Sequence, residues 1–336
     1  MDLSKEIASK GRLVDDFMLE LLKICTSDEL YEILVHQVAS GGKRVRPALA
    51  ILSCEAVGGN SELAIPAAAG VELIHNYTLI FDDIIDRSEL RRSLPTVRAK
   101  YGDVMAVLAG MHYREAVFEA AIRSPKSRKI EKIFSVALKR IIEGERLDVL
   151  FEQAGRESEY IKKMRRTSIS EKDYLEMVEA KTAVLFEASC KAGGIVGNGP
   201  RTQVDALSKF GRNCGMAFQI KDDILDIVGD SGDFGKEVGK DIKEHKLGNL
   251  ALLRALAEVS DNDREKLTAI LKSPFIRDSD VKKTIKTILL KDAIECAYKK
   301  SRSFIATAKS NLDRIPPSKA KHTLVCIADF IIERKF

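Results

Sequence analysis

The chain has 336 residues, of which 45% are hydrophobic and 31% are charged. This balance is typical of a globular protein and excludes an intrinsically disordered one. The formal net charge of +5 is small beside 55 basic and 50 acidic residues, and without a concentrated basic face we expect no nucleic-acid partner. No stretch reaches the ~18 apolar residues that a membrane span requires, and the N-terminus lacks a signal-peptide pattern. We therefore expect no transmembrane segment and a cytoplasmic location.

The six cysteines are widely scattered along the chain, and no two of them form a CxxC pair. Most of them lie in apolar or helix-like segments. This pattern indicates buried, reduced thiols and argues against a disulfide framework or a zinc site.

Almost every long segment has the periodicity of a helix. Residues 13–24 carry one apolar stripe at helical spacing, and residues 134–141 carry another. Pro66 is expected to open an Ala-rich helix between them. Glycines cluster at a few breaks, but no Pro/Ser-rich linker divides the chain. We therefore predict an all-α fold, a single-domain helical bundle over residues 1–336.

A five-residue aspartate motif occurs twice. Residues 82–86 read Asp-Asp-Ile-Ile-Asp and residues 222–226 read Asp-Asp-Ile-Leu-Asp, each after a largely apolar helical run. On a helix, the first and last aspartates of each motif share a face. One copy alone could be a charged helix end in water, but the repetition favours a function. Carboxylates without His or Cys suit Mg²⁺, which completes its coordination with water and substrate phosphates, better than zinc.

Basic residues accompany these motifs. Residues 41–47 read Gly-Gly-Lys-Arg-Val-Arg-Pro, in which Lys43 and Arg46 could bind phosphate oxygens. His75 lies seven residues before the first motif, on nearly the same helix face, and Arg91-Arg92 follow that motif. Taken singly, each could be a solvated or structural residue. Together with the aspartates they describe a pocket for a diphosphate bound through metal.

The sequence resembles the trans-isoprenyl diphosphate synthases along nearly its whole length. The landmarks of that family occur in family order: residues 41–47, Glu72-Leu-Ile-His75, the first aspartate motif, Arg91-Arg92 with Pro95-Thr96, Lys181-Thr182, residues 218–226 with the second motif, Gly239-Lys-Asp-Ile242 and Lys246. The resemblance implies a helical bundle around a central substrate cavity, the isoprenoid synthase type I fold. It also implies a homodimer.

The resemblance assigns a role to each landmark. Metal ions on the allylic diphosphate would be held by Asp82, Asp86 and Asp222, with Asp226 and Asp241 supporting through water. The allylic diphosphate itself would be held by Arg91, Lys181 and Lys236, with Lys246 as a further substrate-binding residue. Isopentenyl diphosphate would be held by Lys43, Arg46, His75 and Arg92. Thr182 and Gln219 would stabilise the developing carbocation with their oxygen dipoles, beside Lys181.

Two departures from the family pattern are visible. Ser93 stands where the family usually has Gly after the arginine pair, and Met111 stands where it usually has Asp after Ala-Gly. Neither position is a principal metal ligand, so the expected activity is retained.

Product length in this family depends on bulk just before the first aspartate motif. Tyr77 and Thr78, one large and one small residue, resemble the archaeal-type geranylgeranyl diphosphate synthases, which stop at twenty carbons. An ideal helical wheel places Tyr77 well off the Asp82 face, so an ordinary core tyrosine is an alternative. Farnesyl (C15), geranylfarnesyl (C25) and longer products remain alternatives to C20.

Two other functions are less consistent with the sequence. A terpene cyclase would share the fold and the first motif, but its second metal site typically has Asn/Asp, Ser/Thr and Glu at wider spacing. A non-catalytic regulatory subunit tends to lose one aspartate motif, whereas both are intact here. We therefore expect a Mg²⁺-dependent prenyltransferase that condenses isopentenyl diphosphate with dimethylallyl, geranyl or farnesyl diphosphate and releases diphosphate.

Overall fold

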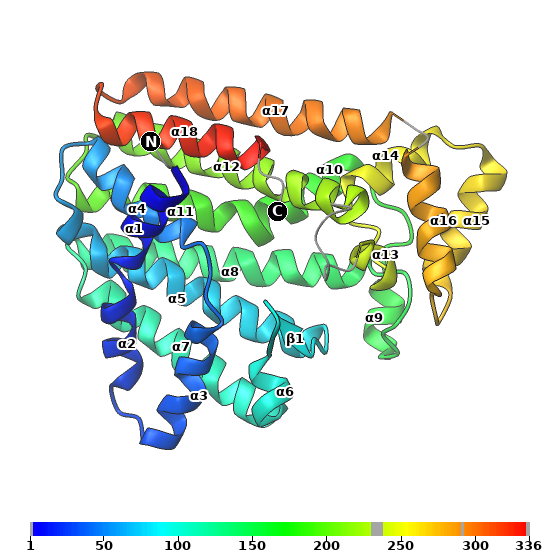
Figure 1. Cartoon of the computed structure of the whole chain (residues 1–336), viewed down its shortest axis with the longest axis horizontal. Coiled ribbons are helices and arrows are strands. Elements are labelled where there is room, and N and C mark those ends of the chain that lie inside the picture. The colour runs from blue at the N-terminus through cyan, green and yellow to red at the C-terminus, as the bar shows by residue number, and fades with distance from the viewer. Residues whose placement is uncertain (1–2, 230–237, 290–291, 334–336) are drawn as a thin grey trace. The chain divides into compact units, whose positions relative to one another are not determined.

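The structure, a computed structural model, describes residues 3–229, 238–289 and 292–333. Within these ranges nearly every element is a helix, as Figure 1 shows. The strands that they contain are β1 (Leu90–Arg91) and β2 (Leu94–Pro95), which pair antiparallel as a short hairpin. The predicted all-α fold is therefore confirmed.

The chain divides into two compact units. The first comprises Met1–Lys139, Leu185–Gly211 and Asn311–Ile327, and the second comprises Arg140–Val184, Arg212–Ser310 and Ala328–Phe336. Each unit is described below by itself. The single domain over residues 1–336 stays a prediction.

The first unit is built from the N-terminal helices. Their bounds are α1 (Leu3–Arg12), α2 (Asp15–Lys23), α3 (Asp28–Ala39), α4 (Val45–Ala56), α5 (Ser61–Ile85), α6 (Val97–Tyr101), α7 (Asp103–Ile122) and the first half of α8 (Ser127–Phe151). Gly70 of α5 allows close packing, because a Cβ there would lie 2.4 Å from the ring of Phe134. The unit also contains most of α11 (Val184–Val196) and the start of α12 (Arg201–Val228).

Helix α5 is the central helix of this unit. It begins at Ser61, where the Asn60 side chain accepts a hydrogen bond from the Glu62 amide. Pro66 therefore lies in the second turn, and the expectation that it opens the helix is wrong because the cap precedes it. By length and composition α5 could cross a membrane, with a mean hydropathy of 1.2, but 61% of its apolar window is buried, as in a core helix.

The second unit contains the remaining elements. They are α9 (Glu159–Met164), α10 (Glu171–Val178), the π-helix η1 (Glu179–Ala183), α13 (Lys240–Lys243), α14 (Leu250–Glu258), α15 (Asp261–Lys272), α16 (Asp278–Leu289) and α17 (Ala293–Asn311). The 3₁₀ turn η2 (Leu312–Arg314) and the first part of α18 (Lys319–Glu333) belong to the first unit, and α18 from Ala328 onward belongs to the second. One core of this unit packs Phe151 and Tyr174 against Ile220 and Ile224 of α12.

Candidate active site

The first aspartate motif ends α5. Asp86 caps the helix, and its amide donates a 2.8 Å hydrogen bond to the carbonyl of Asp82, so the two outer aspartates keep helical spacing. The middle residue, Asp83, is buried and accepts hydrogen bonds from Arg91: Nε lies 3.0 Å from both carboxylate oxygens and a terminal nitrogen lies 2.7 Å from Oδ1. Arg91, expected on the allylic diphosphate, is therefore also an anchor between the hairpin and α5.

The β1–β2 hairpin presents the second arginine of the pair. Arg92 and Ser93 form its two-residue turn with φ of +52° and +64°, the left-handed backbone of a type I′ turn. Glycine is favoured at such positions, so Ser93 departs from the family pattern at a site where the backbone prefers glycine. The Arg92 guanidinium donates a hydrogen bond to the carbonyl of Gly41. The hairpin and the 41–47 loop are thus connected.

A cluster of cations surrounds His75 in the same unit. Lys43 is exposed, whereas Arg46 is half-buried and lies over the Phe186 ring at 4.7 Å. Burial, followed by the nearby charges of Arg46 and Arg92, holds the pKa of His75 well below its usual value. The imidazole is therefore neutral at pH 7, and its N–H can donate a hydrogen bond to an anion. Of the residues predicted for isopentenyl diphosphate, the structure places Arg46 and Arg92 near His75.

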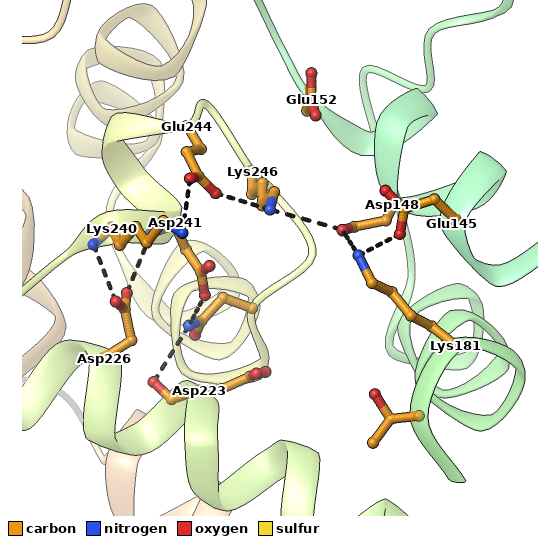
Figure 2. Close-up of polar contacts among 12 residues, drawn as sticks. Glu145, Asp148, Glu152, Lys181, Asp223, Asp226, Lys240, Asp241, Glu244 and Lys246 are labelled. Atoms are coloured by element: carbon orange, nitrogen blue, oxygen red, sulfur yellow. Dashed lines mark hydrogen bonds and ion pairs between the residues drawn. The ribbon is translucent and has the colours of Figure 1, made fainter. Parts of the chain in front are cut away.

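The second aspartate motif lies on α12. Asp226 accepts hydrogen bonds from the amides of Lys240 (2.9 Å) and Asp241 (3.3 Å), at the start of α13 (Figure 2). The Asp241 carboxylate accepts a 2.9 Å hydrogen bond from the Asn249 side chain. Burial, and then the charge of Asp241, raise the pKa of Asp226 to about 7. Such crowding of carboxylates fits a site completed by a divalent cation.

The middle aspartate of this motif is structural as well. Asp223 is buried, and its carboxylate accepts hydrogen bonds from the Tyr174 hydroxyl (2.7 Å), the Leu250 amide (3.0 Å) and the Gln219 side chain (3.1 Å). Gln219 also accepts a 2.8 Å hydrogen bond from the Thr182 hydroxyl. The predicted catalytic pair Thr182 and Gln219 is therefore held in one hydrogen-bonded chain with Asp223 and Tyr174.

Lys181 and Thr182 lie on the π-helix η1. A π-turn widens the helix by one residue and often marks a functional site. Gly144 allows α8 to approach η1 closely, because a Cβ at this residue would lie 2.3 Å from the backbone nitrogen of Lys181. The sequence predicted a helix here but could not indicate its irregular turn.

A charged network joins the two predicted lysines of the second unit (Figure 2). Lys181 Nζ lies 2.7 Å from Asp148 and 2.5 Å from Glu145, and Lys246 Nζ lies 3.7 Å from Asp148 and 2.8 Å from Glu244. Burial raises the pKa of Asp148, but Lys181 and Lys246 overcome this and lower it to about 2. Asp148 therefore stays ionised.

The predicted site residues thus fall into two sets. The first unit holds Lys43, Arg46, His75, Asp82, Asp86, Arg91 and Arg92, and the second holds Lys181, Thr182, Gln219, Asp222, Asp226, Asp241 and Lys246. Lys236 lies outside the described residues. Among the described residues, no three His, Cys, Asp or Glu side chains form a complete metal-binding group. Pairs of carboxylates nevertheless fit Mg²⁺, which takes one or two protein carboxylates and fills its other positions with water and phosphate.

Sequence reasoning missed the residues that hold these side chains in place. Asp148 and Glu145 lie on an amphipathic helix without any repeated motif, and Tyr174 resembles an ordinary core residue. Arg44 lies within the basic motif of residues 41–47, but the sequence pattern predicts no role for it.

The predicted chain-length residues lie one to two turns before Asp82. Tyr77 and Thr78 are half-buried, and the Tyr77 ring packs against Phe81 with centroids 5.0 Å apart. Phe81 in turn packs on Gly110 of α7, where a Cβ would lie 2.4 Å from its ring. The two aromatic rings form a block beside the Ala-Gly-Met segment of α7.

Comparison with known proteins gives consistent results. The sequence matches the polyprenyl synthetase family over residues 27–288. A short chain isoprenyl diphosphate synthase of Methanothermobacter thermautotrophicus is 37% identical over 338 residues, covering 100% of this chain and 99% of the relative. A geranylgeranyl diphosphate synthase of Methanosarcina mazei is 34% identical, with coverage of 100% and 99%.

Solved structures agree with these relatives. The geranylgeranyl pyrophosphate synthetase of Pyrococcus horikoshii has a TM-score of 0.89 at 36% identity, covering 99% of this chain and 98% of that one. A polyprenyl synthase of Caulobacter crescentus, complexed with calcium and isoprenyl diphosphate, has a TM-score of 0.89 at 27% identity, again with coverage of 99% and 98%.

Proposed function

Because the chain belongs to the polyprenyl synthetase family, we propose that it is a Mg²⁺-dependent trans-prenyltransferase that condenses isopentenyl diphosphate with allylic diphosphates. The predicted family and fold are confirmed. One observation carries the reaction. In each aspartate motif the middle carboxylate makes structural hydrogen bonds to side chains of other segments, and the outer two aspartates stand four residues apart on one helix face.

Mg²⁺ is proposed as the metal, bound through the outer aspartates and the diphosphate. Asp82 and Asp86 would provide ligands from α5, and Asp222 and Asp226 from α12, with Asp241 beside Asp226. Bound there, the metal would neutralise charge on the departing diphosphate. The calcium and isoprenyl diphosphate in the Caulobacter crescentus structure support a hard divalent cation in this family.

The protein's own groups would bind and orient the two substrates. Arg91 and Lys181 would hold the allylic diphosphate, with Lys246 as a further substrate-binding residue, and the His75 cluster would hold isopentenyl diphosphate. As the allylic C–O bond breaks and diphosphate departs, the Thr182 and Gln219 oxygens would stabilise the carbocation, which the isopentenyl double bond attacks. The new carbocation then loses a proton to the released diphosphate, which leaves the double bond of the product. The Thr182–Gln219 hydrogen bond supports this role, because it fixes both dipoles before reaction.

Geranylgeranyl diphosphate is proposed as the main product. The Tyr77–Phe81 block beside α7 supports a floor below Asp82 that limits chain growth. The relative in Methanosarcina mazei and the structure from Pyrococcus horikoshii are both named for the C20 product. C15 and C25 are the alternatives.

We also propose a homodimer formed through α7. The helix carries an apolar stripe, defined as Val104, Leu108, Met111, Phe118 and Ile122, whose members are 40–69% exposed. Their spacing of three, four and seven residues places them along one face. Exposed apolar surface of this extent favours association with another chain. A second copy is the proposed occupant, because a two-fold dimer buries the same face of both chains.

A cytoplasmic location is proposed as well. Cys54, Cys190 and Cys214 are buried, Cys25 is exposed, and Cys296 and Cys326 are half-buried, so the expected burial holds for three of the six. The scattered spacing of the cysteines, without a CxxC pair, supports a reducing compartment.

One assay tests the reaction and its product together. The purified protein is incubated with labelled isopentenyl diphosphate, Mg²⁺ and each allylic starter, and the dephosphorylated products are separated by chain length. Geranylgeraniol as the main alcohol supports the proposal. Longer or shorter alcohols would retain the reaction and reject the C20 product. A lack of elongation with every starter would reject the enzyme and favour a regulatory subunit.

A further inference from the structure

The two N-terminal helices precede the region that matches the family, which begins at residue 27. Both of them contact Arg44 of residues 41–47. A Cβ on Gly11 of α1 would lie 2.4 Å from the Cβ of Arg44 and 2.5 Å from its carbonyl oxygen. Only glycine at residue 11 allows this approach of α1 to the loop.

Arg44 itself has an unusual backbone, and its guanidinium contacts three protein acceptors. Its φ of 49° and ψ of 35° place a non-glycine residue in the left-handed region, directly before α4. Such a conformation persists where surrounding contacts impose it. The buried guanidinium donates hydrogen bonds to Asp15 of α2 (3.0 Å), Glu72 of α5 (3.0 Å) and the carbonyl of Gly41 (3.3 Å).

These contacts determine the shape of the loop on both sides of Lys43. Gly41 accepts hydrogen bonds from Arg44 and from Arg92, so both guanidinium groups restrain the same carbonyl. At Gly42, a Cβ would lie 2.9 Å from one Arg92 nitrogen and 3.2 Å from one of Arg44. The loop therefore folds around the two arginines.

Glu72 provides the balancing negative charge in this cluster. It is buried, and burial raises its pKa above the usual value, although the guanidinium groups of Arg44, Arg46 and Arg92 offset part of that rise. Because Arg44 contacts Glu72 directly, it ties the loop to the helix that carries His75. The N-terminal helices thus reach the cation cluster through Asp15, Arg44 and Glu72.

We propose that Arg44 is a positioning residue for isopentenyl diphosphate, fixed by Asp15 and Glu72 so that Lys43 and Arg46 meet the diphosphate in the correct geometry. The inference rests on the proposed function. We assign Arg44 to positioning because its Nε and one terminal nitrogen already donate to Asp15, to Glu72 and to the carbonyl of Gly41. This proposal gives α1 and α2 a role in shaping the site for isopentenyl diphosphate.

The test compares Arg44→Lys and Asp15→Asn with a matched control, Arg98→Lys. Arg98 also joins two carboxylates, Glu89 and Asp103, each at 2.9 Å, but lies on α6. KM is measured separately for isopentenyl diphosphate and for farnesyl diphosphate, together with the thermal midpoint. Isopentenyl diphosphate binding is also measured by calorimetry.

We expect Arg44→Lys to raise the KM and Kd for isopentenyl diphosphate about tenfold, because an ammonium cannot make the three-acceptor fork. Asp15→Asn should raise them about threefold, and Arg98→Lys should leave them unchanged. The KM for farnesyl diphosphate should stay within about twofold in every variant.

Two results would overturn the inference. One is an unchanged Kd for isopentenyl diphosphate in Arg44→Lys. The other is a parallel rise of both KM values with a lowered thermal midpoint, which would indicate general destabilisation. If the wild-type protein forms no product, the proposed function fails, while calorimetry still tests whether Arg44 controls isopentenyl diphosphate binding.

Discussion

Oδ2 of Asp148 lies 2.7 Å from Nζ of Lys181, and the same oxygen lies 3.7 Å from Nζ of Lys246. One buried carboxylate therefore contacts two lysines that come from different segments of the second unit. Because both lysines are proposed to bind substrate, Asp148 fixes the spacing of two substrate cations (Figure 2). Each of the two lysines thus has an ion pair with Asp148 in the absence of substrate.

The replacement Asp148→Asn should weaken folding and catalysis together. The lowered pKa of about 2 means that the ionised carboxylate stabilises the fold above pH ~4 and that this stabilisation is lost as the pH falls towards 2. We expect the variant to lose about 2 kcal/mol in the free energy of unfolding at pH 7 and to converge with the wild type near pH 2. Urea denaturation at both pH values measures this.

Glu157→Gln is the control for that experiment, since it removes an exposed ion pair with Lys162 in the same unit. It should leave unfolding at pH 7 unchanged, because solvent screens such pairs. If Asp148→Asn differed from the wild type equally at pH 7 and pH 2, the ionic role of Asp148 would be excluded.

Outer and middle aspartates should respond differently to removal of the charge. Asp82→Asn should lower kcat at least about 100-fold with little effect on stability, because it removes a proposed metal ligand. Asp223→Asn should lower the thermal midpoint, because its carboxylate holds Tyr174 and the Leu250 amide inside the protein. Chelation with EDTA should abolish activity in the wild type, and added Mg²⁺ should restore it.

If Asp82→Asn and Asp223→Asn lost activity equally and kept the stability of the wild type, the proposed difference between outer and middle aspartates would be contradicted. Tyr174→Phe is a matched partner, since it removes only the hydroxyl that donates to Asp223. It should lower stability in the same direction as Asp223→Asn and change the Mg²⁺ dependence of kcat little.

The helical spacing of the outer aspartates could be predicted from the sequence, because residues four apart share a helix face whatever the tertiary structure. The role of the middle aspartates could not. Asp83 binds Arg91 only because the hairpin turns through two residues with positive φ, and Asp223 binds Tyr174 from 49 positions away. Long-range contacts of this kind leave no periodic signal.

The same limit applies to the lysines and the loop. Lys181 was predicted on a helix, but the π-turn that carries it depends on the close approach of Gly144. Arg44 was part of the basic motif, yet its partners Asp15 and Glu72 come from two other helices. Local patterns identified what binds the substrates, whereas tertiary packing determines what holds the binding residues.

The aromatic block below Asp82 should control product length. Tyr77→Ala and Phe81→Ala remove rings that pack against each other and against α7, so the growing chain gains room. We expect the product to lengthen by at least one five-carbon unit, seen by chromatography of the dephosphorylated alcohols. Tyr77→Phe is the control and should leave the product unchanged, because it keeps the ring that packs against Phe81 and removes only the hydroxyl. An unchanged product in both ring variants would show that these two rings do not limit the length of the product.

The apolar stripe of α7 makes a prediction about assembly. Met111→Glu places a charge at the centre of the stripe, where burial against a second copy would leave it without a partner. We expect sedimentation velocity to show a dimer for the wild type and a monomer for this variant at micromolar concentration. Phe275→Glu, a change at an even more exposed apolar residue outside α7, should leave the dimer intact. A dimer that survives Met111→Glu, or a wild-type monomer, would show that α7 does not form the interface.

Helix α7 also packs against Phe81, so assembly and product length are expected to be linked. A monomeric variant with altered product length would indicate that dimerisation stabilises the Tyr77–Phe81 block of the proposed chain-elongation site.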